Sequence, residues 1–135
     1  MRFTVYGKPV AKGRPKFSSR GGFVRSYTPE KTVNYENLVK LSFDMCEEKA
    51  KLDGQLGVEM VVYCPIPKST SKKNKALMLD GSIRPTTKPD LDNIAKAILD
   101  ALNGRAFDDD KQVVKLTMEK YYSDTPRVEV EISEV

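Results

Sequence analysis

The sequence contains no histidine, and its two cysteines stand alone. The absence of histidine excludes the serine and cysteine triads that depend on it, histidine–metal nucleases and the common zinc hydrolases. Cys46 and Cys64 lack the spacing of a zinc site or a disulfide framework, so we expect both to be core residues. If this chain is a hydrolase, carboxylates and a metal ion are the main chemistry left to it.

The chain also lacks long apolar runs, internal repeats and a convincing linker. Its 135 residues fit one domain of ordinary size, and we expect residues 1–135 to form a single compact unit. No apolar run approaches the roughly 20 residues that span a bilayer. These features predict a cytoplasmic protein that does not interact with a membrane.

Acidic residues are missing from two segments that are rich in lysine and arginine. Residues 1–29 contain seven basic side chains and no acidic one, and residues 65–89 contain six against Asp80 alone. A basic run can be an ordinary solvated loop. Two such segments around an acidic cluster instead favour nucleic-acid binding, because cations must hold the phosphate backbone near carboxylates that would repel it. The candidate DNA-binding residues are Lys12, Arg14, Lys16, Arg20, Lys72, Lys73, Lys75 and Lys88.

Carboxylates gather between residues 88 and 113. Asp90 and Asp92 lie close together, and Asp108, Asp109 and Asp110 follow in one run. Carboxylate oxygens without histidine or paired cysteines are the ligands that magnesium prefers. An aspartate before a helix is often only a cap, and an acidic turn is often only solvated. The combination favours a metal site, because crowded carboxylates repel one another unless a cation offsets their charge.

The apolar pattern of residues 90–103 predicts a helix with one buried stripe, in which Asp90 and Asp92 occupy the first turn. Lys96 lies one turn beyond Asp92, where it could act in catalysis or form an ordinary ion pair with Asp92. Residues 107–110 read as a turn into a strand. We expect Asp110 to stand at the mouth of that strand and to face back toward the helix start.

The remaining pattern predicts strands at residues 1–9, 58–66, 112–122 and 127–134, with the last two forming a hairpin. Helices are predicted at residues 71–79 and from residue 29 to about 51, the second of these burying Val33, Leu38, Leu41 and Met45. The predicted fold class is α+β, with a four-stranded mixed sheet and helices packed on one side.

One stretch of the chain resembles the RusA family of Holliday-junction resolvases. It consists of Lys88-Pro89-Asp90-Leu91-Asp92-Asn93-Ile94-Ala95-Lys96, followed by Asp100-Ala101-Leu102-Asn103-Gly104 and Asp109-Asp110-Lys111-Gln112-Val113. The resemblance implies a homodimer, magnesium or manganese as cofactor, and catalysis by three aspartates and a lysine. By position these are Asp90, Asp92, Asp110 and Lys96. Gln112 and Val113 set the register on Asp110, and the three-residue acidic run leaves Asp109 open as an alternative metal ligand.

The sequence thus predicts a magnesium-dependent endonuclease that resolves four-way DNA junctions by paired symmetric nicks in recombination and repair. In such a reaction, metal-activated water attacks a phosphodiester in line with the leaving oxygen. Two alternatives share the same residues. One is a metal-dependent nuclease for flaps or other branched DNA. The other is a non-catalytic DNA-binding module whose acidic cluster is a folding or calcium site.

Overall fold

The computed structural model describes residues 1–13, 16–18, 25–27 and 29–135. Its centre is a four-stranded sheet in the order β1-β6-β4-β5, built from β1 (Arg2–Tyr6), β4 (Leu56–Pro65), β5 (Val113–Ser123) and β6 (Arg127–Glu134). β6 runs antiparallel to β1 and β4, whereas β4 and β5 are parallel, so the sheet is mixed. The connection between the two parallel strands carries α2, α3 and the acidic run.

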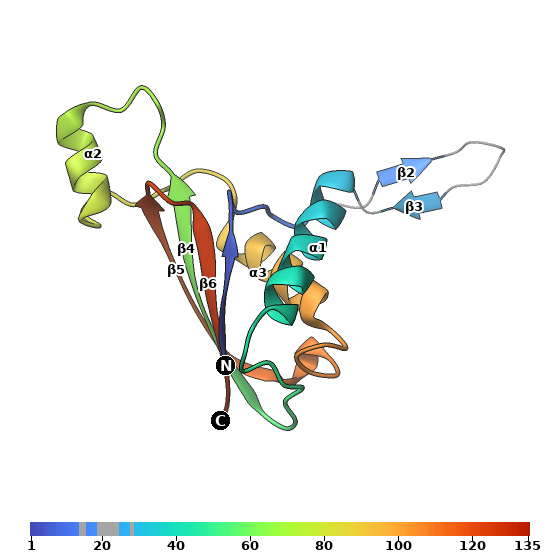
Figure 1. The fold of residues 1–135 in the computed structure, drawn as a ribbon. Coiled ribbons are helices and arrows are strands. Elements are labelled where there is room, and N and C mark those ends of the chain that lie inside the picture. The colour runs from blue at the N-terminus through green and yellow to red at the C-terminus, as the bar shows by residue number, and fades with distance from the viewer. Residues whose placement is uncertain (14–15, 19–24, 28) are drawn as a thin grey trace.

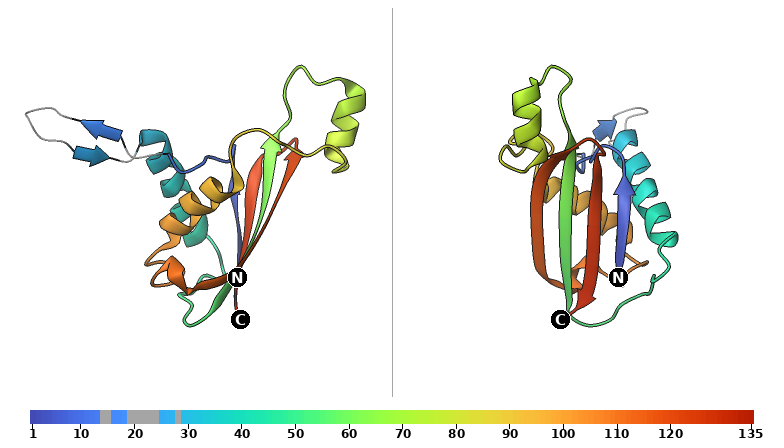
Figure 2. Two further views of the ribbon diagram at one scale, coloured as in Figure 1. Left: turned by 180° about the vertical axis from the view of Figure 1, so that it is seen from behind. Right: turned by 60° about the vertical axis from the view of Figure 1, so that its left-hand side comes forward.

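Two helices form a layer on one face of the sheet, as Figures 1 and 2 show. They are α1 (Glu30–Asp44) and α3 (Leu91–Leu102). The third helix, α2 (Lys72–Leu79), lies beyond one end of the strands and on the other side. None of the helices in the described ranges is long and apolar enough to cross a membrane.

The core lies between the sheet and the α1–α3 layer. Alternate residues of β6 point into it, and Val128, Val130 and Ile132 are buried as the sequence predicts. Met60 of β4 pairs with Val130 and is also fully buried. The predicted α+β class and four-stranded mixed sheet are confirmed. The predicted hairpin of the last two strands is wrong, because β4 lies between β5 and β6 and pairs with both.

The face of α1 that packs on the core differs from the predicted one. Its buried residues are Thr32, Tyr35, Val39 and Phe43, and the helix ends at Asp44 rather than near residue 51. The residues expected in the core are exposed instead, with Leu41 at 56% and Met45 at 75% exposure and Val33 and Leu38 also on the surface. Aromatic packing determines which face of α1 is buried, because Phe43 packs edge-on against Phe3 of β1, with 5.8 Å between ring centroids.

Two projections extend from the end of the sheet nearest the start of α3 (Figure 1). One contains the antiparallel pair β2 (Lys16–Ser18) and β3 (Arg25–Tyr27). The other carries α2, whose Lys75 pairs at 3.4 Å with Asp124 in the connection between β5 and β6. In the loop after α2, the Arg84 side chain donates to the carbonyl oxygen of Lys120 and stacks on the Tyr121 ring.

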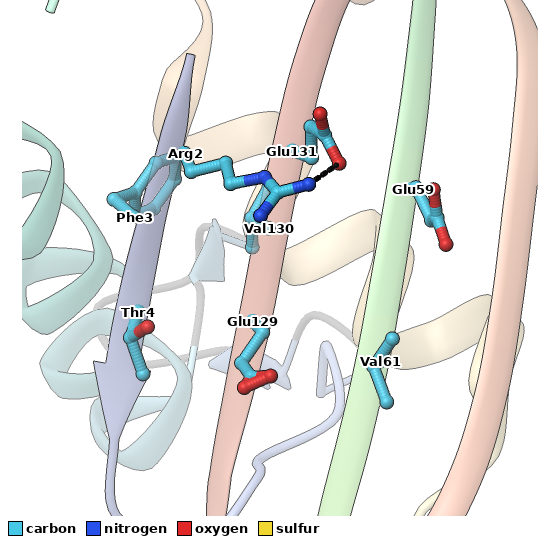
Figure 3. Close-up of a pocket in the computed structure, with 8 residues that line it drawn as sticks. All are labelled: Arg2, Phe3, Thr4, Glu59, Val61, Glu129, Val130 and Glu131. Carbon is cyan, nitrogen blue, oxygen red and sulfur yellow. Dashed lines mark ion pairs between the residues drawn. The ribbon is translucent and has the colours of Figure 1, made fainter. Parts of the chain in front are cut away.

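The face of the sheet opposite α1 and α3 is open and carries several carboxylates (Figure 3). Glu59 of β4 stands directly across from Glu131 of β6, and Glu129 lies two residues along the same strand. Arg2 pairs with Glu131 at 3.2 Å. Like charges directly opposite each other on a sheet are unfavourable. Arg2 offsets the charge of Glu131, and Arg127 pairs with Glu129 at 3.4 Å, so the carboxylates of this face are largely matched by arginines.

Candidate active site

The first turn of α3 presents Asp90 and Asp92. Asp90 is the N-cap residue, with extended backbone at φ −75° and ψ 145°, and the helix begins at Leu91 as the apolar pattern predicts. The Asp90 carboxylate makes no capping hydrogen bond to the helix. Both side chains are exposed. The ordinary capping role therefore does not account for Asp90, and its carboxylate is available for another ligand.

Lys96 follows in the second turn of α3, and its partner is not Asp92. Its Nζ donates to Oδ1 of Asp100 at 2.9 Å, one turn further along the helix. The hydrogen bond and charge of Asp100 raise the pKa of Lys96 above its ordinary value, and the charge of Asp110 adds to this. Lys96 is therefore a cation at neutral pH, suited to stabilise negative charge rather than to accept a proton.

The acidic turn, residues 108–112, is held in place by amide side chains. Asp109 caps a 3₁₀ helix, Asp110–Gln112, and its carboxylate accepts from the Lys111 N–H at 2.9 Å. Oε1 of Gln112 accepts from the N–H groups of both Asp108 and Asp109. Asn103, the residue after α3, accepts the N–H of Asp110 through Oδ1 at 2.9 Å. These bonds fix the turn against the end of α3.

The carboxyl groups of Asp109 and Asp110 interact with each other. Partial burial raises the pKa of Asp110, and the hydrogen bond and charge of Asp109 add to the shift. The pKa of Asp109 is lowered, first by the backbone hydrogen bond from Lys111 and then by its hydrogen bond with Asp110. Ionising both carboxyl groups of such a pair is unfavourable, and a bound cation would reduce this cost.

The acidic turn lies beside the second half of α3. The sequence analysis predicted instead that Asp110 would face the start of the helix. Asp110 contacts Asn103 and feels the charges of Lys96 and Asp100, whereas Asp90 is at the other end of a 12-residue helix, about 18 Å long. Among residues whose placement is described, no three acidic or thiol side chains are grouped closely enough to hold one metal ion.

The residues present nevertheless fit magnesium in their chemistry. They offer two carboxylates at the start of α3 and two in the acidic turn, and all the donors are oxygens. Magnesium is usually bound through one or two carboxylates, with water and phosphate oxygens completing its octahedron. Lys96 stands between the two groups, one turn from Asp92 and within the electrostatic reach of Asp110.

The predicted DNA-binding lysines fall into different environments. Lys72 and Lys73 are exposed on α2, and Lys75 pairs with Asp124. Lys88 is exposed just before α3. The side chain of Lys16 and the residues Arg14 and Arg20 lie outside the described part of the chain.

Lys12 has an internal role as well. Its Nζ pairs with Glu36 of α1 and, at 3.3 Å, with Asp100 of α3. The backbone N–H of Lys12 donates to the carbonyl oxygen of Asn93 at 2.9 Å. Burial opposes the charge of Lys12, but the two carboxylates outweigh it and raise the pKa of this lysine. Lys12 thus joins the N-terminal segment to both helices.

Three residues of the site have roles that the sequence analysis did not assign. Asp100 holds Lys96, and Asn103 and Gln112 hold the acidic turn. The motif could have indicated these roles, because it contains all three residues. Neither the end of a helix nor the beginning of a strand requires these residue types at these positions.

Comparison with known proteins identifies the family. The model of the family described as endodeoxyribonuclease RusA matches residues 6–133 of this chain. The chain belongs to the RusA family. The match includes α3, the acidic turn, β4, β5 and all of β6 but its last residue, whereas only Tyr6 of β1 lies within it. The resemblance seen in residues 88–113 therefore extends through nearly the whole domain, in a family of nucleases.

A relative from Bacillus subtilis (strain 168), named uncharacterized protein YqaN, is 45% identical over 137 aligned residues. The alignment covers all of this chain and 96% of the relative. The two proteins therefore share the RusA-like domain along its full length.

Proposed function

We propose that this RusA-family protein is a magnesium-dependent endonuclease that resolves four-way DNA junctions. The observation that supports this most is the position of Lys96, a cation held by Asp100 between the carboxylates of α3 and those of the acidic turn. A structural cation site would gain little from a fixed lysine beside it. A site that handles phosphate needs such a cation, because negative charge builds up on the transferring group.

In the proposed mechanism, Asp90 and Asp92 would bind metal from the start of α3 and Asp110 from the acidic turn, on either side of Lys96, with Asp109 as a further candidate ligand. Bound magnesium or manganese would supply Lewis-acid charge at the phosphate and lower the pKa of bound water. Lys96 stabilises the charge on the phosphate during in-line displacement. Asn103 and Gln112 keep the acidic turn in position, and the exposed lysines hold the DNA backbone.

We further propose that the active unit is a homodimer. A junction must be cut at two symmetric positions, and a two-fold dimer supplies two sites in matching orientation. Among the described residues, exposed apolar side chains are grouped in two places: Leu38, Leu41 and Met45 on α1, and Val114 and Leu116 on the edge strand β5.

The decisive experiment is cleavage of a labelled synthetic four-way junction beside linear duplex, flap and single-stranded DNA, with magnesium or with a chelator. We expect the wild type to make paired symmetric nicks in the junction and only with magnesium. Asp90→Asn should abolish the nicks, whereas the matched control Asp53→Asn, an exposed carboxylate outside the site, should not.

Other outcomes identify the alternatives. Preferred cleavage of flaps would replace the resolvase with a nuclease for other branched DNA. Junction binding without nicks, unchanged by Asp90→Asn, would mean that the acidic groups are structural and that the protein is a DNA-binding module.

A further inference from the structure

A groove of about 400 Å³ runs beside Asp90, between the segment that follows β1 and the beginnings of α1 and α3. Three of its lining residues are lysines from three separate parts of the chain: Lys8, Lys31 and Lys88. Asp90 is the one acidic residue among the described residues that line it. Lys8 and Lys31 lie outside the motif and are not accounted for by the proposed chemistry.

The three lysines are free to bind an external anion. All are exposed, and within the described ranges none of them forms an ion pair. Other lysines of the protein are engaged, such as Lys12, Lys51 and Lys96. Cations that share one groove without carboxylate partners repel each other, and a polyanion that enters the groove relieves this repulsion.

The groove also has apolar lining residues. They include Pro9, Val10, Pro29 and Pro89, and Pro9 is buried. A nucleic-acid backbone has the matching character, since phosphates alternate with sugars whose carbon faces are weakly polar. A groove lined by both lysines and proline rings therefore suits a sugar–phosphate chain better than a free phosphate ion.

The walls are fixed before any ligand enters. The Lys12 N–H donates to the carbonyl oxygen of Asn93 on α3, and the Gly13 N–H donates to Oγ1 of Thr32 on α1 at 2.9 Å. Gly13 approaches α1 so closely that a Cβ atom there would lie 2.9 Å from both Cγ of Pro29 and Oγ1 of Thr32. A groove held in this way loses little conformational entropy on binding.

From these observations we infer that the groove holds the sugar–phosphate backbone of the DNA strand next to Asp90, with Lys8 and Lys31 as phosphate-binding residues alongside Lys88. The inference rests on the proposed function for its substrate class, and it adds the path of the strand into the site.

The test compares two double variants with equal loss of charge. Lys8→Gln/Lys31→Gln removes the new contacts. Lys40→Gln/Lys115→Gln is the control, because neither residue lines the groove, and Lys40 is nine positions along α1 from Lys31, on the opposite side of the helix. Junction affinity is measured in chelator between 50 and 200 mM salt, and thermal melting confirms that both variants are folded.

Each phosphate contact contributes about 0.9 to the slope of log affinity against log salt. The groove variant should therefore have a slope smaller by about two, so its loss of affinity over this salt range should be roughly tenfold less than that of the wild type. The control should keep the wild-type slope. A groove variant that keeps the wild-type slope, or whose slope falls no more than that of the control, overturns the inference.

The same measurements separate this inference from the proposed function. If the wild type cuts junctions but the groove variant keeps the full slope, the path of the strand is wrong and the nuclease proposal stands. If the slope falls as expected but wild type makes no nick with magnesium, the groove binds DNA and the nuclease proposal fails. Absence of salt-dependent DNA binding by the wild type would overturn both.

Discussion

Lys96 is the residue whose environment bears most directly on the proposed chemistry. Asp100 holds its Nζ at 2.9 Å and raises its pKa, so the ammonium group is fixed and charged near neutral pH. The side chain is largely exposed, and an exposed ion pair on a helix contributes only about 0.3–0.5 kcal/mol to stability. Removing it should therefore affect the reaction far more than the fold.

We predict that Lys96→Ala abolishes junction cleavage while the midpoint of thermal unfolding and the affinity for the junction remain close to those of the wild type. Cleavage assays at saturating protein, together with binding in chelator, measure the two effects separately. Full activity in this variant would remove Lys96 from the mechanism.

Asp110 differs from Lys96 in that its charged form should lower the stability of the fold, although the proposed reaction needs it. Its folded-state pKa is raised above the ordinary value of 3.8, chiefly by burial and then by Asp109. The folded protein therefore holds this proton more tightly than the unfolded chain, and ionised Asp110 destabilises the fold at any pH above its raised pKa. The penalty disappears as the pH falls through that pKa.

We predict that Asp110→Asn, without metal, is more stable than the wild type at pH 7 by about 0.5 kcal/mol, the size of a modest surface charge effect. The gain should shrink toward pH 4, and the variant should not cut DNA. Urea unfolding at several pH values measures this. A variant less stable than the wild type at pH 7 would contradict the assigned shift.

Among the secondary-structure elements, α3 could be predicted almost to the residue. Its apolar residues recur regularly at steps of three and four, and Ile94, Ile98 and Leu102 are all fully buried. A regular stripe of this kind leaves only one face that can pack on the sheet. The candidate residues on the helix were therefore placed correctly along it, whereas Asp110 was not, because the course of a turn depends on side-chain bonds such as those of Asn103 and Gln112.

α1 shows why pattern alone is insufficient. Its apolar residues are divided between two faces, and the buried set includes Thr32 and Tyr35, which a simple apolar count undervalues. Tyr35 is buried because its large ring covers much apolar area. The last two strands were predicted to form a hairpin, but the strand order β1-β6-β4-β5 places β4 between them, because this order depends on pairing between residues far apart in the chain.

The packing of α1 leads to a direct comparison of two substitutions in one helix. Phe43→Ala removes a buried ring that packs on Phe3 and should lower the free energy of unfolding by about 3–5 kcal/mol. Leu41→Ala removes an exposed side chain and should change it by no more than about 0.5 kcal/mol. Denaturant unfolding of both variants at low protein concentration tests the assignment. Equal losses would mean that the helix packs differently.

The contact between α3 and the acidic turn gives a second prediction for an element. Asn103→Ala removes the acceptor of the Asp110 N–H and should loosen the turn without removing any proposed metal ligand. Groups that orient metal ligands typically matter by about 10- to 100-fold in metal affinity or activity. We expect the magnesium concentration for half-maximal cleavage to rise by that order, with junction binding in chelator unchanged. Lys111→Ala, which changes an exposed neighbour, is the control.

At the scale of the whole molecule, the two uncovered apolar areas make the assembly testable. We predict that sedimentation equilibrium at micromolar concentration gives twice the chain mass of 15.2 kDa. Leu41→Glu and Leu116→Glu place a charge in one area each, and the variant that dissociates the dimer identifies the interface. A wild-type protein that is strictly monomeric would contradict the dimer.

Charge is distributed unevenly between the open face of the sheet and the opposite side of the domain. Glu59, Glu129 and Glu131 lie on that face, and the groove lysines lie on the other side, beside α1 and α3. On the sheet face, Arg2 and Arg127 are paired with Glu131 and Glu129, whereas within the described ranges the three groove lysines form no ion pair. A polyanion that diffuses toward the protein is therefore attracted more strongly to the groove side. Most encounters with DNA would then begin in the orientation that leads to Asp90, because carboxylates on the sheet face engage the arginines that could otherwise bind DNA there.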